Sequence, residues 1–175
     1  MRNPSNFRTF LLKWPNQHIW ANLNCSGDGR WIYEAIQNQT LVCVADGSYI
    51  RELHSTVCAT ALIMECSRGS GRLTLSFTDT SPHANAYRGE LLGLMAIFLI
   101  LHGVHLSQPG LPGSVMIYSD CQGALTTVTR LSSLHCPPNW KHSDVLQLIV
   151  LYGQGYSFST TLHHVKAHQD DNSEW

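Results

Sequence analysis

The sequence has little charge. Only 13% of its 175 residues are charged and the net charge is −1 with histidine neutral, so no surplus of either sign marks a nucleic acid or a membrane surface as partner. Hydrophobic residues make up 43%, and the length suits one domain with a proper core rather than two. A chain of this composition that acts on nucleic acid would need a metal ion or another domain to supply positive charge.

Paired cysteines and a secretory leader are also lacking. The six cysteines include no C-x-x-C pair, which argues against a zinc site and a dense disulfide framework and favours reduced thiols. The N-terminal stretch MRNPSNFRTFLLKWPNQ has a short apolar core and no small-residue cleavage site, so it is not typical of a signal peptide. We therefore expect an intracellular protein, in the cytoplasm or nucleus, that is not secreted.

Residues 1–40 show little periodicity. They are polar and aromatic and are interrupted by Pro4, Pro15 and two glycines. We interpret them as a lead-in that docks through its aromatic residues, or as the tail of a preceding domain, with a short helix near Trp31–Asn38.

A regular pattern begins at Leu41 and predicts an α/β fold. Strands are predicted at Leu41–Asp46, Ser55–Cys66, Arg72–Asp79, Ser114–Ser119 and Tyr156–Val165. Helices are predicted at Ala84–Leu106, Gln122–Leu134 and Ser143–Tyr152, the last capped by Ser143 or Asp144. This order favours a mixed five-stranded sheet, in the strand order 3-2-1-4-5, with helices on both faces. The first helix is apolar nearly all round, but its continuous apolar stretch falls short of the about 20 residues that a membrane span needs, which favours a core helix.

Three acids occupy positions where a charge is costly. Asp46 ends the first predicted strand and Asp120 follows the fourth, so parallel pairing of these strands brings both carboxylates to one end of the sheet. Glu90 lies in the apolar helix, where an ionised side chain needs a partner. Arg88, the one nearby cation in the sequence, projects from another side of that helix.

A divalent metal ion would relieve the repulsion among these acids. Converging carboxylates without cations have raised pKa values, and oxygen-only ligation without cysteine or clustered histidine favours Mg²⁺ or Mn²⁺. Each acid also has an ordinary interpretation: a turn residue for Asp46, a partly exposed helix residue for Glu90 and a helix N-cap for Asp120. Their joint placement at strand ends and on a buried helix favours the metal site.

Four motifs carry a resemblance to a known family. They are ADGSY (Ala45–Tyr49), YRGELLGLMAI (Tyr87–Ile97), YSDCQGAL (Tyr118–Leu125) and HVKAH (His164–His168). In this order and on these elements, over residues 41–170, they resemble a type 1 ribonuclease H domain. Their sequences are similar to those of the ribonuclease H domains attached to retrotransposon reverse transcriptases. Any one motif is weak, but four in order are specific.

The resemblance implies a ribonuclease H-like fold and a divalent-metal-dependent endonuclease. It would hydrolyse the RNA strand of an RNA–DNA hybrid with two Mg²⁺ (or Mn²⁺) ions, with a reverse transcriptase domain as partner in a parent polyprotein and no membrane. Asp46, Glu90 and Asp120 match the metal-binding and catalytic carboxylates of the family. His168 matches a mobile histidine that assists proton transfer or product release.

Substrate contacts are expected beside these acids. Ser48, Asn85 and Gln122 are polar residues near the strand ends, placed to contact the 2′-hydroxyls that distinguish RNA from DNA, although each is also an ordinary turn or capping residue. His163 and His164 are expected to be strand residues rather than ligands.

The sequence departs from the family at its end. The family's fourth carboxylate lies on a C-terminal helix, about ten or more residues beyond the histidine, whereas this sequence ends at Trp175. The basic segment with which the family binds the hybrid is also absent from this sequence. Residues 41–175 are therefore expected to form a domain without its last helix, as in a retroelement-derived fragment with exposed apolar surface. Asp170 or Asp171 would compensate in part, leaving a weak enzyme whose second ion binds in about the millimolar range.

Two other interpretations remain. One is a catalytically inactive ribonuclease H-like module that only binds nucleic acid or a protein, which the missing carboxylate and the near-neutral charge favour. The other is an unrelated metal-free α/β binding domain, in which the three acids are turn and cap residues.

Overall fold

A mixed sheet covered by helices forms the protein. The computed structural model describes residues 6–131 and 136–166 of the chain. The strands are β1 (Asn24–Cys25), β2 (Leu41–Ser48), β3 (Val57–Cys66), β4 (Arg72–Thr80), β5 (Ser114–Ser119) and β6 (Ser159–His164). The helices are α1 (Phe7–Leu11), the 3₁₀ helix η1 (Gln17–Trp20), α2 (Arg30–Gln37), α3 (Ala86–Ser107), α4 (Gln122–Leu131) and α5 (Ser143–Tyr152).

The sheet has the order β1-β4-β3-β2-β5-β6. Neighbouring strands from β1 to β2 are antiparallel, whereas β5 runs parallel to both β2 and β6. The five predicted strands thus have the predicted order, 3-2-1-4-5. The expected strand count was wrong, because β1 adds a sixth strand of two residues beside β4, too short to leave a period-2 pattern.

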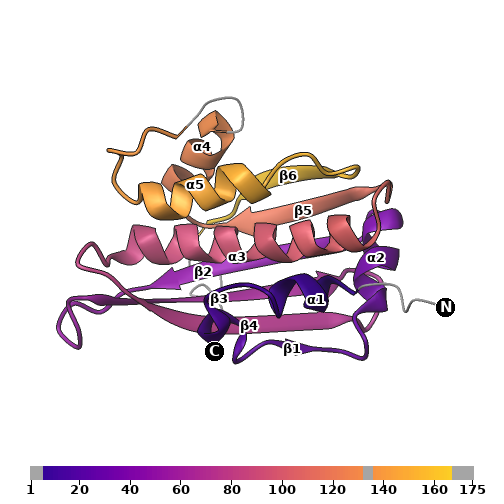
Figure 1. Cartoon of the computed structure of the whole chain (residues 1–175), viewed down its shortest axis with the longest axis horizontal. Coiled ribbons are helices and arrows are strands. Elements are labelled where there is room, and N and C mark those ends of the chain that lie inside the picture. Colours follow the sequence, from indigo (N-terminus) through magenta and orange to yellow (C-terminus); the bar gives the residue numbers. More distant parts are fainter. Residues whose placement is uncertain (1–5, 132–135, 167–175) are drawn as a thin grey trace, which may run out of the picture.

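Helices pack on one face of this sheet in the part of the chain that the structure describes. Along β2 the side chains of Leu41, Cys43 and Ala45 are buried, while Val44 on the opposite face is 41% exposed. Figure 1 shows α3 lying along the sheet, with α1 and α5 on either side of it. Helices were expected on both faces, but the described helices cover the face of Leu41 and leave the other partly open, with half-buried Val42 and Tyr118 on it.

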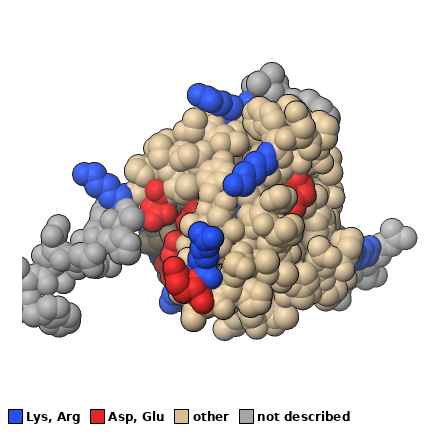
Figure 2. Space-filling model, turned by 90° about the vertical axis from the view of Figure 1, so that its left-hand side faces the viewer, with Lys and Arg blue, Asp and Glu red and all other residues tan. Residues whose placement is uncertain are grey.

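The end of the molecule where β2 and β5 finish has few charged side chains. Seen from this end, most of the surface is neither acidic nor basic, and the basic side chains stand apart from one another (Figure 2). The low charge of the sequence is thus also a property of this surface.

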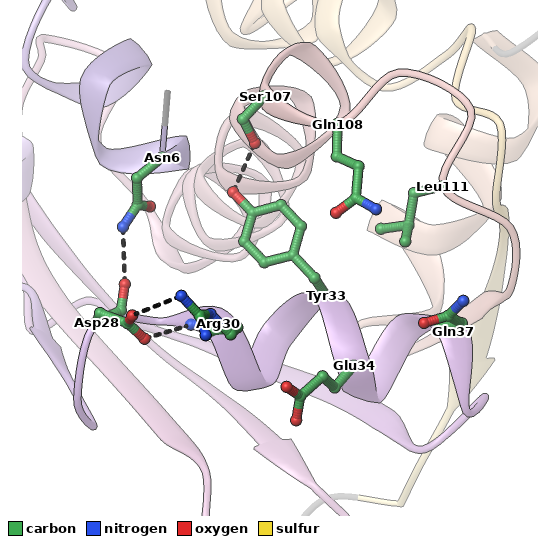
Figure 3. A pocket seen from close by; sticks show the side chains of 9 residues that line it. All are labelled: Asn6, Asp28, Arg30, Tyr33, Glu34, Gln37, Ser107, Gln108 and Leu111. Atoms are coloured by element: carbon green, nitrogen blue, oxygen red, sulfur yellow. Dashed lines mark hydrogen bonds and ion pairs between the residues drawn. The ribbon is translucent and has the colours of Figure 1, made fainter. Parts of the chain in front are cut away.

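The N-terminal segment packs into the same core as the rest of the chain. Phe7 and Ile32 are fully buried, and α1 lies against α3. The Tyr33 hydroxyl lies 2.5 Å from Ser107 Oγ and ties α2 to the end of α3. A pocket of about 390 Å³ lies beside this contact (Figure 3), and none of the described residues that line it is a predicted site residue. The division of the chain into a lead-in and a domain from residue 41 stays a prediction.

The central helix α3 is a core helix. Asn85 caps it, with Oδ1 accepting a hydrogen bond of 2.7 Å from the Arg88 N–H, and every residue from Arg88 to Leu101 is buried. At 22 residues it is long and apolar enough to cross a membrane, contrary to the expectation from its apolar stretch. Because 83% of its most apolar window is buried inside the fold, the predicted core role is confirmed.

The start of α5 corrects a capping prediction. Its bounds are those predicted, but the N-cap is His142, in the left-handed conformation with φ 62°. Ser143 instead donates to the Pro138 carbonyl, and Asp144 binds Arg88. Neither predicted residue therefore caps the helix.

Glycines allow α3 to touch β2 directly. A Cβ added to Gly47 would lie 2.4 Å from the Glu90 nitrogen, and one added to Gly89 would lie 2.7 Å from the Ala59 carbonyl oxygen. Both distances are far below van der Waals contact and both involve backbone atoms, which have little room to move. The first turns of α3 therefore depend on these two glycines.

The substitution Gly47→Ala should lower the free energy of unfolding by about 1–3 kcal/mol, because the methyl group forces α3 away from β2. The control Gly123→Ala, in α4, meets only Tyr87 at an ordinary 3.6 Å and should be neutral or stabilise by about 0.5–1 kcal/mol. Urea titration of both variants measures this difference. Equal effects of the two substitutions would contradict the close contact.

Candidate metal centre

Strand register brings Asp46 and Asp120 together. The last parallel pair between β2 and β5 is Val44 with Tyr118, and each acid lies two residues beyond its member of that pair. Because β2 and β5 run in the same direction, both acids therefore stand at the same end of the sheet. The prediction that Asp46 ends its strand was wrong, because β2 continues to Ser48 through its pairing with β3. What ends at this point is the pairing with β5.

Glu90 reaches the same place from α3. Its side chain is 7% exposed, Oε1 accepts a hydrogen bond of 2.8 Å from the Gly47 N–H, and Oε2 accepts one of 3.4 Å from Ser119 Oγ. Gly47 and Ser119 lie next to the two strand acids in sequence. Glu90 therefore faces the sheet between Asp46 and Asp120.

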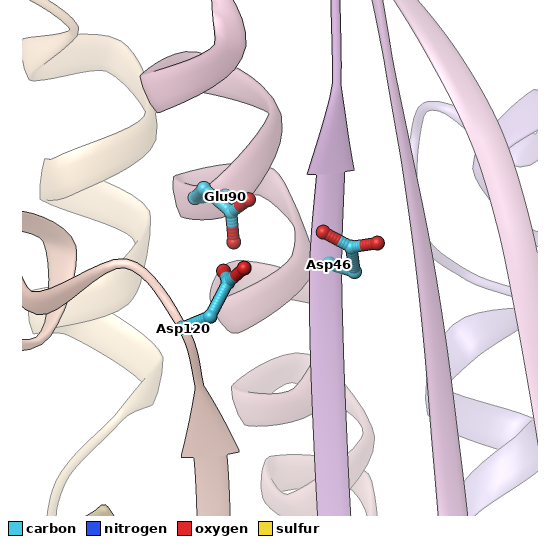
Figure 4. Close-up of side chains that lie close together, drawn as sticks. All are labelled: Asp46, Glu90 and Asp120. Atoms are coloured by element: carbon cyan, nitrogen blue, oxygen red, sulfur yellow. The ribbon is translucent and has the colours of Figure 1, made fainter. Parts of the chain in front are cut away.

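The three carboxylates form one cluster (Figure 4). One oxygen from each of Asp46, Glu90 and Asp120 lies within 4.8 Å of those of the other two, inside the about 6 Å expected for ligands of shared metal ions. Within the described ranges, none of the three forms an ion pair, and the carboxylates of Asp46 and Asp120 accept no hydrogen bond. Arg88, the nearest cation in sequence, binds Asp79 and Asp144 instead.

Burial raises the pKa of Glu90 to about 7. The negative charges of Asp120 and Asp46 act in the same direction, while the hydrogen bonds from Gly47 and Ser119 oppose the rise. The rise predicted for converging acids is thus present at Glu90. A cation at this point would favour the ionised form.

The donor set suits a hard divalent cation. All three groups offer carboxylate oxygens, and the neighbouring Cys121 is no rival ligand, because burial raises the pKa of its thiol, as do the charges of Glu90 and Asp120. Mg²⁺ and Mn²⁺ prefer oxygen ligands. The residues present therefore fit the metal that the sequence predicts.

The remaining predicted residues are spread around the cluster. Ser48 is the exposed last residue of β2, Asn85 caps α3, and the Gln122 amide at the start of α4 donates to Thr126 Oγ1. His163 lies on β6, as expected. The predicted roles of His168 and Asp170, and of Asp171, fall outside the described residues.

Sequence reasoning missed one contact at the cluster. His164, treated as a strand residue only, lies on β6 with Nε2 3.0 Å from the Asp120 carbonyl oxygen, to which it donates. It thereby holds the backbone of one of the three acids. Its place at the end of a strand parallel to β5 is the signal that would have found it.

A groove near the start of α3 was also missed. Two adjoining hollows, of about 530 and 600 Å³, share Asn85 and Lys141 in their walls. The first is also lined by Arg51 and His83 and the second by Trp140, which is 43% exposed, and none of the described residues that line them is an acid. The sequence could have indicated this groove through the run WKH, in which an aromatic residue and a cation are adjacent, between two predicted helices.

The fold is similar to that of solved ribonuclease H structures. The RNase H domain of prototype foamy virus aligns with a TM-score of 0.53 and 15% identity, over 77% of this chain and 84% of that domain. LC11-RNase H1, isolated from compost and solved in complex with an RNA/DNA hybrid, aligns with a TM-score of 0.53 and 9% identity, over 75% of this chain and 88% of that one.

A larger protein contains the same fold. The protease-reverse transcriptase of prototype foamy virus aligns with a TM-score of 0.51 and 15% identity, over 79% of this chain but only 19% of that protein. No family model and no curated protein matches the sequence. The chain has the fold of type 1 ribonuclease H domains, with three carboxylates gathered at the end of its central parallel strands.

Proposed function

We propose that this protein is a divalent-metal-dependent endonuclease that hydrolyses the RNA strand of RNA–DNA hybrids. The observation that carries the proposal is the cluster of Asp46, Glu90 and Asp120, gathered without a cation partner in the described residues. The fold supports it, since LC11-RNase H1 has the same fold and was solved with an RNA/DNA hybrid. A reverse transcriptase domain in a parent polyprotein belongs to the same proposal, because the foamy virus fold lies within a protease-reverse transcriptase.

The three carboxylates would hold Mg²⁺ or Mn²⁺. Bound there, the ions would polarise the phosphate and lower the pKa of a bound water. The chain supplies the positions: Gly47 and Ser119 orient the Glu90 carboxylate, and His164 holds the backbone of Asp120. His168, for proton transfer or product release, and Asp170, as a further ligand, complete the proposed site.

The groove beside α3 would take the backbone of the hybrid. Lys141 and Arg51 form no ion pair in the described part of the chain, so both are available to phosphates. Trp140 offers an exposed ring for stacking. Ser48, Asn85 and Gln122 are the proposed contacts to 2′-hydroxyls; Asn85 already lines the groove, and its Oδ1 is occupied by the cap.

A catalytically inactive binding module is the second candidate. It is favoured by the number of acids, because only three carboxylates gather in residues 6–131 and 136–166. Such a module would bind hybrid and metal without cleaving, whereas a metal-free binding domain would bind no Mn²⁺ in a calorimetric titration.

Cleavage of a labelled RNA–DNA hybrid in Mg²⁺ or Mn²⁺ tests the first candidate. Asp46→Asn, Glu90→Gln and Asp120→Asn should each lower the rate by roughly 100-fold or more, since each removes a ligand of ions that stabilise transition-state charge by several kcal/mol. The control Glu34→Gln, an exposed acid on α2, should cleave like the wild type. Hybrid and metal binding without any cleavage by the wild-type chain would favour the second candidate.

Without metal, Glu90→Gln should stabilise the protein at pH 8. The folded pKa of about 7 lies above the ordinary 4.5, so stability present below pH 4.5 is lost as the pH rises through 7. The loss amounts to about 3 kcal/mol, and the amide avoids it. Thermal unfolding in a chelator from pH 4 to pH 8 measures this dependence. A lower melting temperature of Glu90→Gln at pH 8 would make Glu90 a structural partner rather than a ligand.

Substitutions of the two groove residues Lys141 and Trp140 should weaken hybrid binding in different ways. Lys141→Ala should reduce the slope of the logarithm of the binding constant against the logarithm of the salt concentration by an amount equal to about one phosphate contact. Trp140→Ala should lower the affinity and leave this salt slope unchanged. Fluorescence anisotropy with labelled hybrid and no divalent ions measures both. Arg68→Ala, an exposed cation in the β3–β4 turn, is the control. Equal slopes for Lys141→Ala and Arg68→Ala would exclude the groove.

A further inference from the structure

Arg88 is buried and fully engaged. It is 6% exposed and the only buried lysine or arginine in the part of the chain that the structure describes. Nε donates to Asp79 Oδ2 at 2.7 Å, while Nη1 and Nη2 donate to the two carboxylate oxygens of Asp144 at 3.0 and 2.7 Å. Such forked hydrogen bonding fixes the orientation of the guanidinium relative to its carboxylate partners, in addition to pairing the charges.

The three residues belong to three different elements. Asp79 lies near the end of β4, Arg88 is the third residue of α3, and Asp144 is in the first turn of α5. The hydrogen bonds of Arg88 thus fix the start of α3 to the strand before it and to a helix far along the chain. The Arg88 N–H also bonds to the capping Asn85, so backbone and side chain are both held.

Glu90 follows two residues later and points the other way. Two residues turn an α-helix by about 200°, so the side chains of Arg88 and Glu90 leave α3 in nearly opposite directions. Gly89, between them, presses on the β2–β3 backbone. The first turn of α3 is therefore held on one side by the Arg88 fork and meets the sheet on the other, where Glu90 bonds to Gly47 and Ser119.

We propose that Arg88 is a positioning residue for the metal centre: its bonds to Asp79 and Asp144 set where the Glu90 carboxylate stands relative to Asp46 and Asp120. The inference rests on the proposed metal centre. Arg88 forms no ion pair with any of the three clustered acids, so it acts through the placement of α3. Residues that hydrogen-bond a metal ligand typically change metal affinity by about 10–100-fold when they are mutated, and we expect the lower end of this range for Arg88, which acts through the helix.

Arg88→Lys is the main test, because it keeps the charge and removes the fork. A change in metal affinity then comes from geometry rather than from lost charge. Asp144→Asn is the second variant: its side chain is 64% exposed, so it should fold, and it weakens the fork while leaving Arg88 in place. Two controls match them: Arg72→Lys in the exposed pair with Glu65, and Ile32→Val at a fully buried position of α2.

Calorimetric titration with Mn²⁺, at a temperature where every variant is folded, gives the dissociation constants, and thermal unfolding gives the melting temperatures. Arg88→Lys should raise the dissociation constant about tenfold and Asp144→Asn by a smaller factor, with the controls unchanged even where Ile32→Val lowers the melting temperature. A lower melting temperature of Arg88→Lys with wild-type affinity would overturn the inference and leave a structural ion pair. If Arg88→Lys does not fold, unchanged affinity in Asp144→Asn overturns it and weakened affinity supports it. Absence of Mn²⁺ binding by the wild-type chain would instead overturn the proposed function, and the inference with it.

Discussion

Like-charge convergence at one point of the sheet is the constraint on which the rest of this structure depends. The pairing of β2 with β5 ends at Val44 and Tyr118, and the carboxylates of the two acids beyond this pair lie close together, with no cation paired to them among the described residues. Glu90, buried beside them, has its pKa raised to about 7. Such an arrangement opposes folding in the absence of metal, so the remainder of the fold must hold it in place.

Close contact between α3 and the sheet provides that hold. Gly47 and Gly89 let the helix backbone touch β2, and the buried run from Arg88 to Leu101 anchors the helix in the core. Side-chain bonds from Glu90 to Gly47 and Ser119 then orient one carboxylate toward the strand ends. Hydrophobic burial along α3 supplies the stability, while the short polar contacts at its first turn supply the direction.

The sequence predicted the fold and the cluster where the signals were periodic or chemical. The alternation of apolar and polar residues, together with one apolar helix, predicted five strands in the right order. The acids that follow two β-branched runs predicted that Asp46 and Asp120 are neighbours. The errors fell where tertiary contacts decide. The two-residue strand β1 is defined by its pairing with β4, and β2 continues past Asp46 because it remains paired with β3. The groove was missed because Asn85 and Lys141 are distant in sequence and meet only when α5 packs beside α3.

The segment from Asn85 to Glu90 joins the two parts of the proposed site. Asn85 caps α3 and lines the groove, Arg88 fixes the helix to β4 and α5, and Glu90 belongs to the carboxylate cluster. These side chains share less than two turns of one helix, so their spacing is set by helix geometry rather than by loops. A hybrid lying in the groove would therefore be placed relative to the carboxylates by a rigid element. For the proposed hydrolysis, rigid placement would matter because the phosphate must be aligned with the metal ions, and a misplacement of about 1 Å typically costs about 100-fold in rate.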